Sequence, residues 1–194
     1  SFIATSNSKG HLGLLAMGLR VSNIDTAYEN LLKKAGMSTS PEDIWSDKGQ
    51  ELRLRALELT NKQKEIYIKG RLGVIIDGTG KDYAEIKKQV DMLRTLGYAV
   101  HMIFVNTDLE TALERNRMRP RSLADDLVTK MWKDVQKNIG KFQGLFRNRM
   151  IVIDNSKGSD IEASTLEAYK DIKTWAAKAP ENSIAVKWIK GQKK

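Results

Sequence analysis

The stretch LGVIIDGTG, from Leu72 to Gly80, decides the fold expected for this chain of 194 residues. It is a short apolar run that ends at glycines, which is typical of a strand covered on both faces. The following segment, residues 81–97, places Ile86, Val90 and Leu93 on one face and ends at a glycine, so it predicts an amphipathic helix. A buried strand followed at once by a helix is the repeating unit of a parallel α/β sheet.

The same alternation continues on both sides of this unit. Further strands are predicted at residues 19–25, 98–106 and 149–155, and further helices at residues 26–36, 48–69, 109–119, 123–146 and 160–179. This order predicts an α/β fold, a three-layer α/β/α arrangement around a mostly parallel sheet. We expect a single domain over residues 1–194, in which a C-terminal helix and a basic, solvated tail occupy about residues 160–194.

Charge and cysteine content limit the chemistry and the partners of the chain. Its 33 Lys and Arg against 24 Asp and Glu give a net charge of +9, which favours anionic partners such as nucleotides or nucleic acid. The sequence contains no cysteine, which excludes disulfides, thiolate nucleophiles and cysteine-based metal sites and favours the reducing cytoplasm. Two histidines give little support to a histidine metal site or a serine hydrolase triad. No apolar run approaches the ~18 residues of a membrane span, so no membrane partner is expected.

The ends of the predicted strands are the first place to look for chemistry, because ligands of open parallel sheets bind beyond the carboxyl ends of the strands. Asp25 and Asp77 each end a predicted strand and open a loop into a helix. Carboxylates in this position can hold a magnesium ion or accept a proton from a hydroxyl. Asp25, which Thr26 follows, also has the pattern of a helix N-cap, a purely structural role. The other strand ends carry Asn106, Asp154 and Asn155.

Four arginines gather around Pro120, at Arg115, Arg117, Arg119 and Arg121. Positive charges this close repel one another in the absence of an anion. A loop that folds over phosphate groups would turn them toward one point, as a lid does, so we expect an arginine lid at about residues 115–122. A solvated basic face is the alternative interpretation.

Five segments, in this order, resemble the zeta-toxin group of P-loop kinases. They are NIDTAYE, the run from VIIDGTG through the next helix and strand to LETALER, ERNRMRPR, VQKNIGKFQGLF and RMIVIDN, and together they cover about residues 19–155. The resemblance implies a P-loop NTPase fold with nucleoside-kinase-like architecture and an ATP- and Mg²⁺-dependent transfer of the γ-phosphoryl group to a hydroxyl. The acceptor would be a nucleotide-sugar, as the nearest family implies, or the 5′ end of a nucleic acid, which suits the net charge. An antitoxin-like protein would be a further partner.

The resemblance also implies roles for single residues. Asp25 matches the aspartate that takes the proton from the acceptor hydroxyl. Asp77 matches the acidic residue that helps to hold substrate or metal, where zeta toxins have Glu, and Thr79 is the expected substrate contact. Arg115 matches the arginine that touches the ATP phosphates.

The second lid arginine and the adenine site follow in the same way. Arg121 matches the second lid arginine, with Arg119 as the alternative, because Arg121 lies beyond Pro120, where a lid can swing. Asp154 and Asn155 end the last predicted strand, where these kinases place the adenine of ATP.

The chain departs from the family at its first residues, since the phosphate loop GxxxxGK[ST] is absent from the sequence. GTGK at residues 78–81 does not qualify, because the first glycine of a loop would fall at Ile75 and Asp82 replaces the hydroxyl residue. The opening SFIAT resembles the residues that follow the lysine of such a loop, with Ser1 as the magnesium-binding serine. We therefore expect the first strand and most of the phosphate loop to precede Ser1, and kinase activity in a full gene product that contains them.

A second hypothesis belongs to a different class of function. It is a non-catalytic, kinase-like module that binds nucleotide or nucleic acid or has a structural role. The missing phosphate loop, the basic tail and the aromatic residues Trp175 and Trp188 support it.

Overall fold

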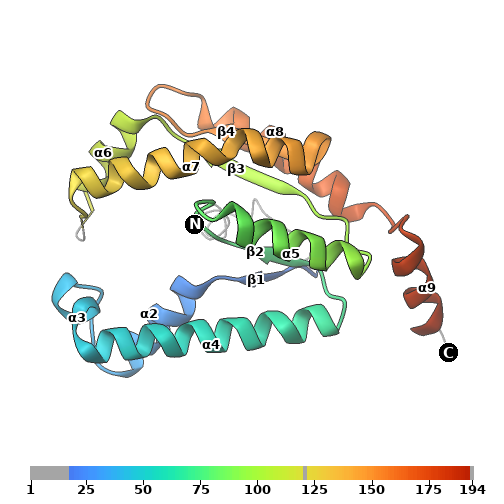
Figure 1. The fold of residues 1–194 in the computed structure, drawn as a ribbon, viewed down its shortest axis with the longest axis horizontal. Coiled ribbons are helices and arrows are strands. Elements are labelled where there is room, and N and C mark those ends of the chain that lie inside the picture. Colours follow the sequence, from blue (N-terminus) through green and yellow to red (C-terminus); the bar gives the residue numbers. More distant parts are fainter. Residues whose placement is uncertain (1–17, 120–121, 193–194) are drawn as a thin grey trace. The chain divides into compact units, whose positions relative to one another are not determined.

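The computed structural model describes residues 18–119 and 122–192 and shows a mixed α/β fold (Figure 1). The described residues form two compact units. The N-terminal unit comprises residues 18–78 together with Arg119 and Ser122, and the C-terminal unit comprises residues 79–118 and 123–192. Each unit contains one pair of parallel strands, and the expectation of a single domain stays a prediction.

The N-terminal unit combines two short strands with three helices. The strands β1 (Arg20–Ser22) and β2 (Val74–Ile76) pair in parallel, with Val21 opposite Ile75. The helices are α2 (Ile24–Lys34), α3 (Pro41–Trp45) and α4 (Asp47–Lys69). α4 packs against α2 and α3 and also contacts both strands. The prediction that β2 is covered on both faces is wrong for the described residues, because Ile76 remains 38% exposed.

The start of α2 differs from the prediction. The Oδ1 atom of Asn23 accepts hydrogen bonds from the backbone N–H groups of Asp25 at 2.7 Å and Thr26 at 3.3 Å, so Asn23 is the N-cap. The helix therefore begins at Ile24, and β1 ends at Ser22. Asp25 lies in the first turn of α2, whereas the sequence pattern had placed it at the end of a strand.

Apolar side chains from all three helices form the core of the N-terminal unit, namely Tyr28, Leu32, Ile44, Leu52 and Ala56. The corner between α3 and α4 depends on Gly49. A Cβ atom at this position would lie 2.1 Å from the carbonyl oxygen of Asp43, closer than real Cβ contacts come. Only glycine therefore allows α4 to approach α3 closely enough to share this core.

The C-terminal unit contains the other strand pair and five helices. β3 (Met102–Asn106) and β4 (Met150–Asp154) pair in parallel along their whole length, from Met102 opposite Met150 to Asn106 opposite Asp154. The helices are α5 (Tyr83–Thr95), α6 (Leu109–Arg117), α7 (Asp125–Phe146), α8 (Ile161–Ala177) and α9 (Ser183–Gln192). A 3₁₀ turn, η2 (Arg147–Arg149), joins α7 to β4.

Phe142 of α7 is the centre of the C-terminal core and has no exposed surface. Its ring lies 5.4 Å from the ring of Tyr83 and 6.2 Å from the ring of Phe104, measured between centroids. Val90 of α5 and Phe146 complete the cluster. α7 is thus held by its apolar face, which leaves its polar face outward.

The C-terminal tail, expected as a basic, solvated end, is helical as far as Gln192 and contains no buried residue in its described part. Asn182 accepts a hydrogen bond from the backbone N–H of Ile184 at 2.9 Å and so caps α9. The helix lies against the end of α5, where a Cβ atom on Gly97 would approach the backbone nitrogen of Ala185 to 2.8 Å. Trp175 of α8 stacks on His101 with a centroid distance of 4.1 Å, which gives this tryptophan a packing role.

The alternation of strands and helices is confirmed, and every strand pair in the described residues is parallel. The strands form two separate two-stranded sheets there, so a single sheet with three layers stays a prediction. Among the described residues, no helix combines the length and apolar character that crossing a membrane requires.

Candidate functional site

The carboxyl ends of β1 and β2 bring two predicted site residues together. The backbone N–H of Asp77 donates to the carbonyl of Ser22 at 3.1 Å, which continues the parallel pairing beyond β2. At this point the Nδ2 atom of Asn23 donates to the Oδ2 atom of Asp77 at 2.7 Å. The Oδ1 atom of the same amide holds the backbone N–H of Asp25. One asparagine thus links the first turn of α2 to the residue that follows β2.

Asn23 leaves the carboxylate of Asp25 available. The alternative role of Asp25 as the helix N-cap is wrong, because the amide of Asn23 caps α2. Asp25 is exposed, and no residue in the described part of the chain donates a hydrogen bond to its carboxylate. The backbone of Asp25 is held in place while its carboxylate oxygens accept no hydrogen bond from a described residue. Such a carboxylate can accept a proton from a bound hydroxyl.

Among the described residues, Asp77 is the expected magnesium ligand. One of its carboxylate oxygens accepts from Asn23, and Mg²⁺ in phosphoryl-transfer enzymes typically binds one or two carboxylates together with phosphates and waters. The donor type fits the ion. Residues 18–119 and 122–192 contain no group of three acidic, histidine or cysteine side chains that would bind a metal by themselves. Ser1, the other expected metal ligand, lies outside the described residues.

The carboxyl ends of β3 and β4 form a second polar edge, in the C-terminal unit. The backbone N–H of Asn155 donates to the carbonyl of Asn106 at 2.7 Å, and the Nη1 atom of Arg115 donates to the carbonyl of Asn155 at 2.8 Å. Asp154 directly precedes Asn155. The expected phosphate-binding arginine and the two expected adenine-site residues therefore lie together at this edge.

Hydrogen bonds hold the aspartates of this second edge in the ionised form. Asp108 caps α6 and accepts from the backbone N–H of Thr111 at 2.7 Å and from its hydroxyl at 2.6 Å. These bonds lower the pKa of Asp108 to about 2. Ser156, whose backbone N–H donates to Asp154 at 3.0 Å, lowers the pKa of Asp154 through its side chain and its backbone. Both carboxylates thus serve to fix the loops that follow β3 and β4.

Hydrogen bonds between Asn116 and Leu123 join the two ends of the arginine-rich segment. The side-chain amide of Asn116, which is buried, donates to the carbonyl of Leu123 at 2.8 Å and accepts from the N–H of Leu123 at 3.0 Å. Arg117, the last residue of α6, forms an ion pair with Asp125, the first residue of α7. Arg119 is exposed and belongs to the N-terminal unit. Arg121 lies outside the described residues, so its expected lid role stays a prediction.

Thr79 lies in a loop that is held by α7. The Nδ2 atom of Asn138 donates to the carbonyls of Gly80 at 3.2 Å and Lys81 at 2.8 Å. Gly80 has a φ of 72°, in the left-handed region that side chains rarely adopt, which explains the glycine at this position. Thr79 itself is exposed directly before this anchored turn, where a substrate contact is sterically accessible.

Three asparagines with positioning roles were missed by the sequence analysis, namely Asn23, Asn116 and Asn138. Asn23 carried a local signal, since an asparagine directly before a helix is a preferred N-cap. Asn116 and Asn138 carried no such local signal, because their hydrogen-bond partners lie in other segments that only the folded chain brings close.

A family model described as an AAA domain matches residues 23–141, more than half of the chain. The chain belongs to this family. The AAA domain family is P-loop NTPase-like and includes kinases, so membership indicates a nucleotide-binding, kinase-like function. The matched region contains Asp25, Asp77 and Arg115 and ends within α7. Searches of curated proteins and of solved structures find no significant match.

Proposed function

We propose that this AAA-domain chain acts as an ATP-dependent phosphotransferase of the zeta-toxin-like group. The enzyme transfers the γ-phosphoryl group of ATP to a hydroxyl of a nucleotide-sugar or of a nucleic-acid 5′ end. The observation that carries the proposal is the exposed Asp25 carboxylate in the first turn of α2, which accepts no hydrogen bond from a described residue. Asn23 links it to Asp77 at the carboxyl ends of β1 and β2. This is the edge where ligands of parallel sheets bind.

In the proposed reaction, Asp25 accepts the proton of the acceptor hydroxyl. The hydroxyl oxygen forms a bond to the γ-phosphorus, the bond from that phosphorus to the bridging oxygen of the β-phosphate breaks, and ADP leaves. The amide of Asn23 keeps Asp25 in position through its backbone, which leaves both carboxylate oxygens for this proton transfer. A magnesium ion at Asp77 would neutralise part of the phosphate charge.

The arginine of the second edge has a complementary role in the proposal. Arg115 is exposed and anchored by one of its terminal nitrogens to the carbonyl of Asn155. A guanidinium held in this way is oriented before the nucleotide arrives, and it stabilises the charge that develops on the transferred group. Thr79 contacts the acceptor, Arg119 and Arg121 close over the phosphates, Ser1 contributes to the metal, and Asp154 with Asn155 borders the adenine.

The decisive experiment compares ATP binding and turnover of the full-length gene product with those of Asp25→Asn. We expect nucleotide binding to survive and transfer to fall by roughly 10²- to 10⁴-fold, since only the proton acceptor is lost. Glu29→Gln is the matched control, because it removes an exposed carboxylate one helical turn away on α2 and should leave activity unchanged. Equal turnover in Asp25→Asn and the unmodified protein rejects Asp25 as the base.

The second candidate is a non-catalytic, kinase-like module that binds nucleotide or nucleic acid. The specific observation in its favour is that polar groups at the β3–β4 edge form hydrogen bonds with one another. Arg115 donates to the backbone carbonyl of Asn155, and the carboxylate of Asp154 accepts from the backbone N–H of Ser156. A folded full-length protein that binds ATP without any turnover would select this candidate.

A further inference from the structure

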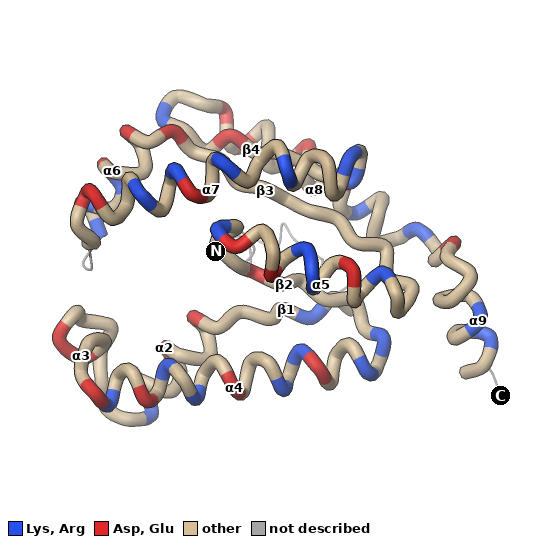
Figure 2. Tube along the Cα trace, in the orientation of Figure 1, with Lys and Arg blue, Asp and Glu red and all other residues tan. Residues whose placement is uncertain are grey.

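α7 carries a row of lysines on the face opposite its buried side. The exposed residues Lys130, Lys133, Lys137 and Lys141 are spaced by three, four and four positions, and we call them the α7 stripe. At 3.6 residues per turn they fall within a band of roughly 80° around the helix axis, and they extend for roughly 16 Å along it. Figure 2 shows basic segments recurring along α7.

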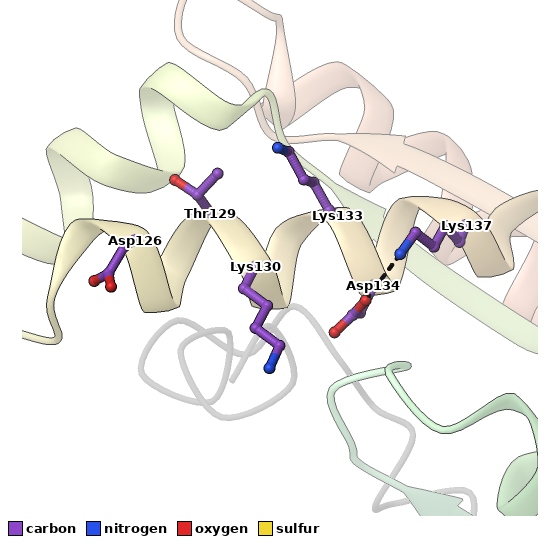
Figure 3. Close-up of a pocket in the computed structure, with 6 residues that line it drawn as sticks. All are labelled: Asp126, Thr129, Lys130, Lys133, Asp134 and Lys137. Atoms are coloured by element: carbon purple, nitrogen blue, oxygen red, sulfur yellow. Dashed lines mark hydrogen bonds and ion pairs between the residues drawn. The ribbon is translucent and has the colours of Figure 1, made fainter.

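Three of the four lysines of the α7 stripe border a hollow of about 410 Å³, which is lined by Asp126, Thr129, Lys130, Lys133, Asp134 and Lys137. Figure 3 shows Lys130 and Lys133 pointing to opposite sides of this face, while Lys137 turns toward Asp134. The pair between Lys137 and Asp134 measures 3.3 Å and is largely exposed, so it contributes little to stability. Lys130 and Lys133 have no ion pair or hydrogen bond to another side chain among the described residues. Two lysines are therefore available to an anion.

Three arginines lie at the C-terminal end of α7, one from α5 and two from η2. Arg94, Arg147 and Arg149 line a second hollow of about 450 Å³ together with Gly144, which falls on the same side of α7 as the stripe. No acidic residue lines this hollow. Arg94 donates to the carbonyl of Leu145 at 2.9 Å, which fixes one guanidinium at the end of the helix. We call these three residues the arginine hollow.

We propose that the α7 stripe and the arginine hollow together bind the phosphate backbone of a nucleic acid. Seven cationic side chains lie along α7 and at its C-terminal end, and only Asp126 and Asp134 are acidic among the residues that line the two hollows. This excess of positive charge complements a polymer that carries one negative charge per repeat. Both hollows are open and lined mainly by exposed side chains, unlike the enclosed pockets that bury small ligands. The net charge of +9 favours the same class of partner.

The side chains of the α7 stripe also argue against a membrane surface as the ligand. A helix that lies on a membrane inserts an apolar face next to its basic residues. The apolar face of α7, which includes Val135, Ile139 and Phe142, is packed inside the C-terminal unit instead. Contacts to phosphates without contacts to bases are independent of sequence. The surface does not depend on the proposed transfer reaction, because none of its residues belongs to the proposed catalytic group.

The test measures binding of the full-length protein to a fluorescent 20-nucleotide single-stranded DNA, the matching RNA and the DNA duplex, over a range of salt concentrations. For Lys130→Gln combined with Lys133→Gln, we expect affinity for the preferred probe to fall on the order of tenfold at 0.1 M salt. The slope of log K against log salt should become shallower by about 1.4 for a single strand or 1.8 for a duplex. The probe that shows this change identifies the form of nucleic acid that is bound.

Two further variants test whether the effect on binding is specific to α7. Lys170→Gln combined with Lys173→Gln removes the same charge from α8, in the same unit, and should leave the salt slope unchanged. Asp134→Asn releases Lys137 and should strengthen binding. The proposal is overturned if the α7 and α8 variants weaken binding equally, if neither changes the slope, or if polyglutamate displaces the nucleic acid at equal charge concentration.

The test of nucleic-acid binding can be distinguished from the test of phosphoryl transfer. Asp25→Asn should bind nucleic acid as the unmodified protein does, because Asp25 belongs to the N-terminal unit and the stripe to the C-terminal unit. A protein that binds nucleic acid through α7 and shows no phosphoryl transfer would reject the proposed function and leave this inference standing.

Discussion

The two strand pairs end in edges of opposite character. At the β1–β2 edge, one amide joins Asp25 and Asp77 and leaves the carboxylate of Asp25 unbonded among the described residues. At the β3–β4 edge, the polar side chains and the backbone largely satisfy one another, as the contacts of Asp108 and Arg115 show. The same kind of sheet edge thus carries an exposed carboxylate without a hydrogen-bond donor in one unit and a network of satisfied polar groups in the other. A reacting group needs unbonded atoms, whereas a binding surface needs rigid loops.

The cores beneath the two edges differ as well. Five side chains of α2, α3 and α4 make up the N-terminal core, whereas aromatic rings on β3 and α7 dominate the C-terminal core. Each cluster draws its members from one unit. The stability of each edge should therefore respond to substitutions in its own core.

The largest expected effect comes from Phe142→Ala, which empties the centre of the C-terminal core. Loss of a fully buried phenylalanine should lower the free energy of unfolding by about 3–5 kcal/mol. Hydrogen exchange should then show reduced protection in β3, β4 and α5 and unchanged protection in α2 and α4. Leu32→Ala is the reciprocal control in the N-terminal core, where we expect a loss of about 2–5 kcal/mol. A uniform loss of protection over both units would contradict separate cores.

A smaller effect is expected at the amide that distinguishes the first edge. Asn23→Ala removes the cap of α2 and should cost about 1 kcal/mol in urea unfolding. Asn23→Ser keeps a capping oxygen, but its shorter side chain does not reach Asp77, so most of the stability should be retained. Both variants should reduce phosphoryl transfer if the link to Asp77 positions the reacting groups. Equal losses of stability in the two variants would show that the bond to Asp77, and not the cap, stabilises this edge.

The smallest effect is a pH dependence at the second edge. Because the pKa of Asp108 is lowered from 3.8 to about 2, its ionised form stabilises the fold above pH 3.8, and this contribution is lost as the pH falls toward 2. Asp108→Asn retains an N-cap and removes the titration. Urea unfolding midpoints measured from pH 5 to pH 2 should therefore decline less steeply in the variant. Identical slopes would show that the Thr111 hydrogen bonds do not depend on the charge of Asp108.

Much of the fold could be predicted from local patterns. The order of strands and helices follows from apolar spacing and from glycines at helix ends, and the structure confirms it. The element ends were less well predicted: β2 has only three residues, and β3 begins at Met102 although the pattern began at Tyr98. An apolar run fixes that a strand exists, whereas hydrogen bonds to its neighbour fix how far it extends.

Some site residues could be predicted from local sequence patterns, and others could not. The pattern of strand ends singled out Asp25 and Asp77, and the family that the chain belongs to includes both positions in its matched region. The N-cap of α2 was expected at Asp25 as the alternative to its chemical role, whereas Asn23 is the cap. Both residue types have side chains that cap helices, so the local sequence does not distinguish them. The lysines of the α7 stripe also have helical spacing in the sequence, but which face of α7 stays exposed depends on the packing of its apolar face in the C-terminal core.

The sequence by itself determined the alternation of elements, the positive charge and the acidic residues at strand ends, since these depend on residues within a few positions of one another. Only the tertiary structure decided which amide holds which carboxylate. Asn23 and Asp77 are 54 positions apart, Arg115 and Asn155 are 40, and Asn138 and Gly80 are 58. Local spacing specifies neighbours within about one helical turn or one strand, so partners at such separations become fixed only when packing brings their elements together.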